Sequence, residues 1–200
     1  MRVDGVILAA GRSSRMGANK LTLDLAGRTV IERALACLMP YCRTVYVITR
    51  PGTSGLEPLF AANPRIIPVE NPMPDRGMLS SIKTGLSAVK ADQALILPGD
   101  CPLVKPSTCA RLLAAEADIV VPVYHGESGH PVLIGKRMIS ALLHSCSGSL
   151  RDFIVGQDCT RIEVHDPGIL VDVDTPEDLA FLREMAMPPD TSGTAIRRWC

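Results

Sequence analysis

The sequence begins with a strand-length run of apolar residues, Val3–Leu8, and a polar loop that contains glycine follows it directly and extends to Lys20. From Val30 onward, apolar residues recur at helical spacing until Pro40 ends the pattern. The chain therefore starts as a strand, a long loop and a helix, which is the unit from which layered α/β folds are built.

The same alternation continues along the chain. Further strands are predicted at Thr44–Thr49, Arg65–Val69, Ala94–Leu97, Ile119–Val123, Pro131–Ile134, Arg161–Val164 and Val171–Val173. Further helices are predicted at Gly55–Ala62, over the apolar face Leu79, Ile82, Leu86 and Val89, and at Ser107–Ala115, Lys136–His144, Ser149–Val155 and Pro176–Met185. The polar turn between the strands at 119–123 and 131–134 indicates a hairpin. These units predict a three-layer α/β/α, Rossmann-like fold around a mainly parallel mixed sheet, with ligands at the carboxyl ends of its strands.

The composition excludes several classes of protein. Hydrophobic residues make up 46% of the 200 residues, enough for a sizeable core, so we expect one domain over residues 1–186 and a flexible tail at 187–200. The 21 Lys and Arg residues balance 21 Asp and Glu residues, so no overall field attracts nucleic acid or an anionic membrane. Affinity for phosphate must therefore come from a local site.

The cysteines and the first apolar run indicate the cellular compartment. Seven cysteines, an odd number without a C-x-x-C pair, are typical of reduced thiols, and the cysteines and histidines are too scattered for structural zinc. The run Val6–Ala10 is shorter than a transmembrane span, and an arginine-containing loop follows it in place of a cleavage site. We therefore expect a cytoplasmic protein.

The loop LAAGRSSRMGANK has the features of a phosphate-binding loop. Gly11 allows a tight turn that presents successive backbone N–H groups, and the loop also carries two arginines and a lysine. Its glycine spacing matches neither the P-loop nor the dinucleotide-binding pattern. A solvated surface turn is the alternative, but the position directly after a buried strand favours nucleotide binding. The candidate nucleotide-binding residues here are Leu8, Ala9, Ala10, Gly11, Arg12, Arg15 and Lys20.

This loop resembles the signature loop of nucleotidyltransferases with a glycosyltransferase-A-like fold, and the chain is most similar to the molybdenum cofactor cytidylyltransferases of the MobA/MocA-like family. The resemblance extends over about Val3–Met185. Four further segments carry it: GMLSSIKTGL (Gly77–Leu86), PGDCPLV (Pro98–Val104), GHPVLI (Gly129–Ile134) and VDVDTPEDL (Val171–Leu179). One segment departs from it, because residues Cys146–Arg151 keep only the arginine of the G-D-x-G-x-R segment usual in the family.

The carboxylates after two predicted strands are candidate metal ligands. Asp100 ends a buried strand, and a cation would remove the cost of burying its charge. The resemblance implies that Asp100 and Asp174 hold Mg²⁺, or Mn²⁺ in its place, against the nucleotide phosphates, with Asp172 as the fallback ligand. The structural alternative is that Asp100 caps a turn or helix and that Asp174 only belongs to the start of the last helix.

Polar residues around the start of the helix near residue 80 are further nucleotide-binding candidates. Gly77, Ser80 and Ser81 lie where free N–H groups and the positive end of the helix dipole favour anions or nucleotide hydroxyls. Ordinary N-capping explains them equally well. Asn71 in the preceding loop is placed to reach base or ribose, although loop polarity alone would also account for it.

The resemblance implies that the terminal phosphate of molybdenum-bearing molybdopterin attacks the α-phosphorus of CTP and that pyrophosphate leaves. No protein nucleophile is required, and Arg15, Lys20 and Asp100 would be catalytic through alignment and charge neutralisation. His130 and Arg151 would bind the acceptor, although a structural hydrogen bond is the default role of a lone histidine.

The choice of base and acceptor leaves rival functions open. Related guanylyltransferases usually carry glycine where this chain has Ala10, and a methyl group there disfavours a purine by shape. The rivals are a same-fold enzyme that uses GTP or another phosphorylated acceptor, such as a sugar phosphate or phosphocholine, and a non-catalytic molybdenum cofactor carrier. Small molecules are the expected partners, and a molybdoenzyme or its chaperone would receive the product.

Overall fold

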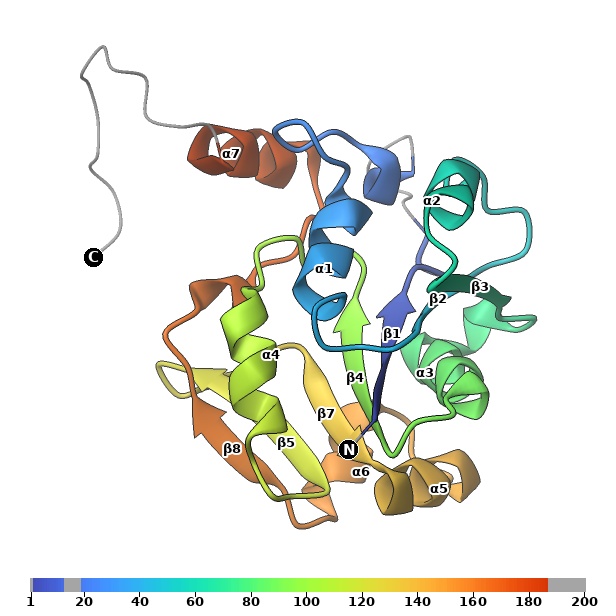
Figure 1. Ribbon diagram of the computed structural model, residues 1–200, viewed down its shortest axis with the longest axis vertical. Helices are drawn as coiled ribbons and strands as arrows, with labels where there is room; N and C mark the ends of the chain where they lie inside the picture. Colours follow the sequence, from blue (N-terminus) through green and yellow to red (C-terminus); the bar gives the residue numbers. More distant parts are fainter. Residues whose placement is uncertain (1, 13–18, 187–200) are drawn as a thin grey trace.

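The computed structural model describes residues 2–12 and 19–186, so the tail expected at 187–200 lies outside the described residues. The strands are β1 (Val3–Leu8), β2 (Val45–Thr49), β3 (Ile66–Glu70), β4 (Gln93–Pro98), β5 (Ile119–Tyr124), β6 (Glu127–Ser128), β7 (Val132–Gly135) and β8 (Thr160–Glu163). They form one eight-stranded sheet in the order β3-β2-β1-β4-β7-β5-β6, with β8 paired to β5 (Figure 1).

Helices cover both faces of this sheet. The α-helices are α1 (Val30–Leu38), α2 (Glu57–Ala62), α3 (Met78–Ala88), α4 (Pro106–Leu113), α5 (Lys136–His144), α6 (Leu150–Val155) and α7 (Pro176–Ala186). Residues of α1, α4 and α7 share a core with one face, and residues of α3, α5 and α6 share a core with the other (Figure 1). The predicted three-layer arrangement is confirmed. Nowhere in residues 2–12 and 19–186 is a helix long and apolar enough to cross a membrane.

The central strand β4 is apolar from Ala94 to Pro98 because both of its faces are buried. In β4, Leu95 and Leu97 belong to the core beneath α1 and α4, whereas Ala94 and Ile96 belong to the core beneath α3 and α5. Side chains alternate between the faces of a strand, so one uninterrupted apolar run supplies two separate cores.

The order of the parallel strands determines where a ligand can bind. The chain passes from β1 outward through β2 to β3 and returns to β4 on the other side of β1, and all of these neighbours are parallel. Loops therefore diverge where the carboxyl ends of β1 and β4 meet, which is the usual ligand site of an open α/β sheet. Here Leu8 is opposite Pro98, and the Gly99 N–H donates to the Leu8 carbonyl over 2.9 Å.

The predicted hairpin is confirmed, since β5 and β7 pair antiparallel with Val120 opposite Leu133. The strand predicted at Val171–Val173 is wrong. A 3₁₀ helix, Pro167–Leu170, precedes an extended segment that belongs to no described strand. Both edges of β4 are already paired, with β1 and β7, so this segment finds no free edge there. It attaches instead through the Val173 N–H, which donates to the Asp100 carbonyl over 2.9 Å.

The buried Asp166 carboxylate connects this last segment to α4. It accepts hydrogen bonds from the Lys105 N–H at 2.8 Å, the Thr108 hydroxyl at 2.6 Å and the Gly168 N–H at 3.1 Å. We predict that Asp166→Ala lowers the free energy of unfolding by about 3 kcal/mol, because buried donors lose their acceptor. Denaturant unfolding measures this loss. Asp118→Ala, which removes an ion pair with the exposed Arg137, is the control and should cost less than about 1 kcal/mol; equal losses would contradict the prediction.

Candidate functional site

An ammonium group lies between two carboxylates where β1 and β4 end. The Lys20 Nζ is 2.6 Å from the Asp100 Oδ2 and 2.8 Å from the Asp174 Oδ1. Three separate segments supply these groups: the loop after β1, the end of β4 and the approach to α7. The sequence-predicted cation and both predicted metal ligands therefore come together at one point.

A capped 3₁₀ turn holds Lys20 in position between the two carboxylates. Lys20 is the first residue of the 3₁₀ helix Lys20–Thr22, and the Asn19 side chain caps that turn by accepting from the Leu21 N–H at 3.2 Å. Burial disfavours the ammonium charge, but the hydrogen bonds and charges of Asp100 and Asp174 outweigh it and raise the pKa of Lys20. The lysine is therefore a fixed positive charge at neutral pH.

The cap at the start of α7 is made by Thr175 and Asp178 and does not use the side chain of Asp174. The Asp178 carboxylate accepts hydrogen bonds from the Asp174 N–H at 3.0 Å and the Thr175 N–H at 2.8 Å, while the Asp178 N–H donates to the Thr175 hydroxyl at 3.1 Å. Thr175 and Asp178 thus cap the helix reciprocally. The side chain of Asp174 is not the cap, and it points to Lys20 instead.

A third carboxylate, Asp172, is affected by the charges of Asp100 and Asp174. Burial, followed by the negative charges of Asp174 and Asp100, raises the pKa of Asp172. The charge of Asp172 is therefore coupled to those of both carboxylates, but within the described residues Asp172 does not join Asp100 and Asp174 in a group of three that could hold a metal ion. Its fallback role as a ligand stays a prediction.

The donor atoms fit Mg²⁺ or Mn²⁺. Two carboxylate oxygens converge on one cationic point, and hard oxygen donors are the ligands that these ions prefer. Within the described residues, no group of three His, Cys, Asp or Glu side chains is arranged to hold a metal by itself. A metal here would therefore take its remaining ligands from water and a phosphate-bearing substrate, as Mg²⁺ commonly does.

The signature loop is described only at its two ends. Ala9 and Ala10 are buried, and Gly11 and Arg12 are exposed. The predicted residue Arg15 lies in 13–18, outside the described residues. The loop therefore begins against the sheet and turns outward at Gly11.

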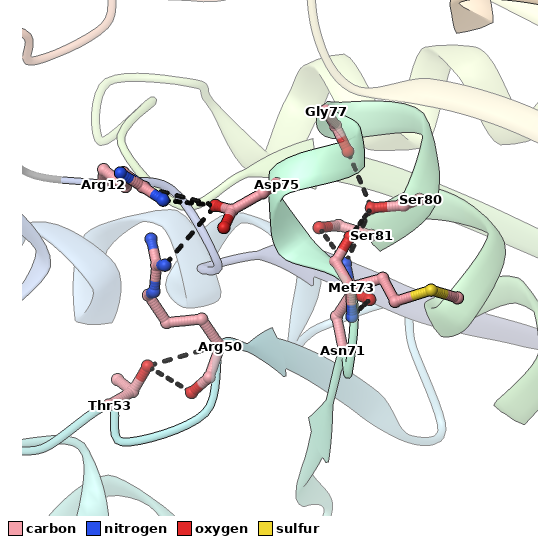
Figure 2. A network of polar contacts seen from close by, with 9 residues as sticks. All are labelled: Arg12, Arg50, Thr53, Asn71, Met73, Asp75, Gly77, Ser80 and Ser81. Atoms are coloured by element: carbon pink, nitrogen blue, oxygen red, sulfur yellow. Dashed lines mark hydrogen bonds and ion pairs between the residues drawn. The ribbon is translucent and has the colours of Figure 1, made fainter.

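Arg12 forms an ion pair with Asp75 at the surface, where both side chains are largely exposed. Its Nη2 and Nε lie 2.8 Å and 3.2 Å from the Asp75 Oδ1, and the Arg50 Nη2 lies 3.6 Å from the same oxygen (Figure 2). Asp75 thereby joins the loops that follow β1, β2 and β3. Sequence reasoning missed Asp75 and Arg50, and only their positions just after predicted strands could have suggested them.

The residues predicted near the nucleotide form a second polar network beside Asp75. The Asn71 amide donates to the Ser80 hydroxyl at 2.8 Å and to the Ser81 hydroxyl at 3.0 Å (Figure 2). Gly77, with φ of 88°, precedes α3 and makes no side-chain cap. The Asn71 amide therefore fastens the preceding loop to the helix through the two serines, and within the described residues no side chain at the N-cap position Gly77 caps α3.

A cleft of about 700 Å³ extends along the sheet face beneath α3 and α6. His130 and Arg151, both predicted to bind the acceptor, line it. The His130 Nδ1 is buried and has no hydrogen-bond partner among the residues that the structure describes. Burial lowers the pKa of His130, and the negative charge of Asp100 partly opposes this. The structure thus brings both predicted acceptor residues to one cleft.

Cys101, next to Asp100, is not a nucleophile. Its side chain is buried, and burial together with the nearby carboxylates raises the pKa of the thiol. The thiol therefore stays protonated at neutral pH, in agreement with its interpretation as a small apolar filler.

The chain is similar along most of its length to known nucleotidyltransferases. Residues 5–160 match the MobA-like NTP transferase domain. A molybdenum cofactor cytidylyltransferase of Escherichia coli is 26% identical over 184 residues, 91% of this chain and 96% of that protein. A probable molybdenum cofactor guanylyltransferase of Chloroflexus aggregans is 28% identical over 206 residues, 92% and 94% of the two chains. A solved nucleotidyl transferase from Methanothermobacter is 24% identical with a TM-score of 0.80, covering 92% of this chain and 97% of that one, and shows the same fold.

The ion pairs of Lys20 generate a prediction about metal binding. Lys20→Met removes a cation that competes for the Asp100 and Asp174 oxygens, so Mn²⁺ should bind about tenfold more tightly in the absence of nucleotide. Electron paramagnetic resonance of free Mn²⁺ measures this affinity. Lys136→Met, on the exposed start of α5, is the control and should leave the affinity unchanged. Weaker Mn²⁺ binding by Lys20→Met would show that the carboxylates do not form the metal site.

Proposed function

Because the chain belongs to the MobA-like NTP transferase domain family, we propose that it transfers CMP from CTP to the terminal phosphate of molybdopterin that carries molybdenum, with release of pyrophosphate. The observation that carries this proposal is the position of Lys20 between Asp100 and Asp174 at the ends of β1 and β4. Nucleotidyl transfer is catalysed mainly by alignment of the reacting groups and by neutralisation of their charge. A cation and two carboxylates at this point suit both tasks.

The chemistry balances without a covalent enzyme intermediate. An oxygen of the acceptor phosphate forms a bond to the α-phosphorus of CTP, and the bond from that phosphorus to the β-phosphate bridging oxygen breaks. A divalent metal bound by Asp100 and Asp174 would neutralise the phosphate oxygens there. The Lys20 ammonium, already held at this centre, would bind the departing pyrophosphate and supply positive charge as it leaves.

Two of the chain's own networks support binding of the nucleotide. The loop that follows β1 begins beside a cleft that Leu8 lines together with Met78 and Leu79 at the start of α3. The surface ion pair between Arg12 and Asp75 links this loop to the turn before α3. A nucleotide here would therefore contact both segments.

Molybdopterin as acceptor is supported by the cleft and by the names of the relatives. Two relatives that are similar along nearly the whole chain are described as molybdenum cofactor nucleotidyltransferases. The cleft begins at Leu8 and His130, beside the carboxylate centre, and its apolar floor suits a flat heterocycle. An acceptor in this cleft could present its phosphate to the nucleotide.

CTP is the proposed nucleotide because of Ala10. This residue is buried just after β1, and its methyl group would narrow the space available to a base bound beside this loop. The relatives include both a cytidylyltransferase and a guanylyltransferase, so the assignment depends on this residue and on experiment.

The activity test uses the purified full chain, Mg²⁺ and each NTP in turn, with and without molybdenum-bearing molybdopterin. Pyrophosphate release should occur only with CTP and this acceptor, and Lys20→Ala should lower turnover at least about a hundredfold. Release with GTP instead would correct the base. Release with a sugar phosphate or phosphocholine would correct the acceptor, and acceptor binding without any release would indicate a carrier.

The base assignment generates a separate prediction. Ala10→Gly should shift the ratio of kcat/KM for CTP to kcat/KM for GTP toward GTP by about tenfold, because a methyl group that excludes the purine is removed. Competition between the two nucleotides in one reaction measures the ratio directly. Ala141→Gly, on the exposed face of α5, is the matched control. An unchanged ratio would mean that another residue selects the base.

A further inference from the structure

Two arginines and one carboxylate lie close together at the edge of the sheet where β1, β2 and β3 end (Figure 2). The Arg12 Nη2 is 2.8 Å from the Asp75 Oδ1, and the Arg50 Nη2 is 3.6 Å from the same oxygen. Each of these residues follows a different parallel strand, and the carboxyl ends of parallel strands are where such sheets bind ligands. The three side chains therefore lie at the edge where the proposed nucleotide would bind.

The single carboxylate does not balance the positive charge around it. Asp75 contributes one negative charge, and both ion pairs use the same oxygen of its carboxylate. Arg76, which directly follows Asp75, is exposed and adds another positive charge. Guanidinium groups that exceed their carboxylate partners attract a further anion, and phosphate suits them best because it accepts paired hydrogen bonds.

The guanidinium of Arg50 has unused capacity to donate hydrogen bonds. Its side chain is only 27% exposed, so most of it is covered by protein. Among the described residues it forms the ion pair with Asp75 but no hydrogen bond, since 3.6 Å is too long for one. A guanidinium has five N–H donors, and covered donors normally find acceptors. Arg50 is therefore placed to bind an anionic ligand.

Local hydrogen bonds hold the turns that carry the carboxylate and the second arginine. The Asn71 side chain accepts from the Met73 N–H at 2.9 Å, and the Ser80 hydroxyl lies 3.0 Å from the Met73 carbonyl oxygen (Figure 2). In the loop after β2, the Thr53 hydroxyl donates to the Arg50 carbonyl over 2.8 Å. Because each turn is held by its own contacts, the exposed ion pairs can exchange partners without unfolding either turn.

The loop after β2 also contacts the turn that carries Lys20. The amide of Asn19, directly before Lys20, donates to the Ser54 carbonyl over 3.3 Å. Arg50 and Ser54 belong to the same short loop. The Arg50 guanidinium and the Lys20 ammonium are thus carried by segments that contact each other, which favours one phosphate-bearing ligand for both.

We propose that Asp75 occupies the place of a nucleotide phosphate in the nucleotide-free chain, and that Arg50 is a further phosphate-binding residue. This rests on the nucleotide-binding part of the proposed function. When the nucleotide binds, its phosphate oxygens replace the Asp75 oxygen as partners of Arg12 and Arg50, and the carboxylate, already 65% exposed, turns to solvent. Asp75 is thereby a built-in competitor that lowers the affinity for nucleotide and for the departing pyrophosphate.

Separate titrations of pyrophosphate and of CTP into the full chain, each with excess Mg²⁺, measure this competition. Asp75→Asn should bind both ligands about tenfold more tightly, since the competing charge is gone while the side chain keeps its size. Arg50→Gln should bind both about fivefold more weakly, and Arg50→Lys should lie between Arg50→Gln and the wild type because a point charge remains. Glu70→Gln, which removes an exposed negative charge at the end of β3, is the matched control and should change either Kd less than about twofold.

A double variant distinguishes competition from a general effect of charge. In the Arg50→Gln background, Asp75→Asn should tighten pyrophosphate binding about threefold or less, because one of the two guanidinium groups that it releases is absent. An equal gain in both backgrounds, or an equal gain from Glu70→Gln, would overturn the proposal, since the removed charge would then act only through the overall field.

The outcomes also separate this competition from the proposed function. If the wild type binds both ligands and Asp75→Asn binds them no more tightly, the competition is refuted while the proposed function stands. Tighter binding of CTP but not of pyrophosphate would also overturn it, because the arginines would then serve the base or ribose. If the wild type binds neither ligand, the proposed function fails first and the competition falls with it. If the predicted gains occur but no acceptor receives CMP, the competition stands and the proposed function fails.

Discussion

The structure depends on one electrostatic arrangement, the Lys20 ammonium held between the carboxylates of Asp100 and Asp174. Two carboxylates that close together would repel each other and resist burial unless a cation lies between them. The lysine supplies that cation and fastens the loop after β1 to the end of β4 and to the approach to α7. The same ion pairs thus join three segments at the carboxyl ends of β1 and β4 and bring together a cation and two carboxylates. Nucleotidyl transfer depends on groups of this kind.

The sheet explains why this arrangement occurs where it does. Strands β1 and β4 are neighbours whose following loops diverge, so backbone N–H groups, a lysine and a carboxylate all reach one crevice. The antiparallel strands β5 and β7 extend the same sheet sideways and provide the floor of the cleft that begins at His130. Nucleotide and acceptor would therefore occupy adjoining parts of a single surface, with the carboxylate centre between them.

Local patterns predicted most strands and helices, because strand length and helical spacing are properties of short segments. The pairing of Asp174 with Asp100 came from the resemblance to nucleotidyltransferases, since no local pattern brings these two residues together. Features that join distant segments were not predictable in this way. No local pattern pairs Arg12 with Asp75, or brings Arg50 to the same carboxylate. The strand expected at Val171–Val173 was wrong for the same reason: its residues suit a strand, but β1 and β7 already occupy both edges of β4.

If Lys20, Asp100 and Asp174 direct nucleotidyl transfer to a phosphate acceptor, the most direct measurement follows CTP labelled at the α-phosphorus in the presence of Mg²⁺ and molybdenum-bearing molybdopterin, with the wild type and Asp100→Asn. The wild type should transfer the label into a dinucleotide and release unlabelled pyrophosphate. Asp100→Asn, although folded, should do neither. Label that remains in CTP, or that is released by the wild type only as free CMP, would contradict this role of the three residues.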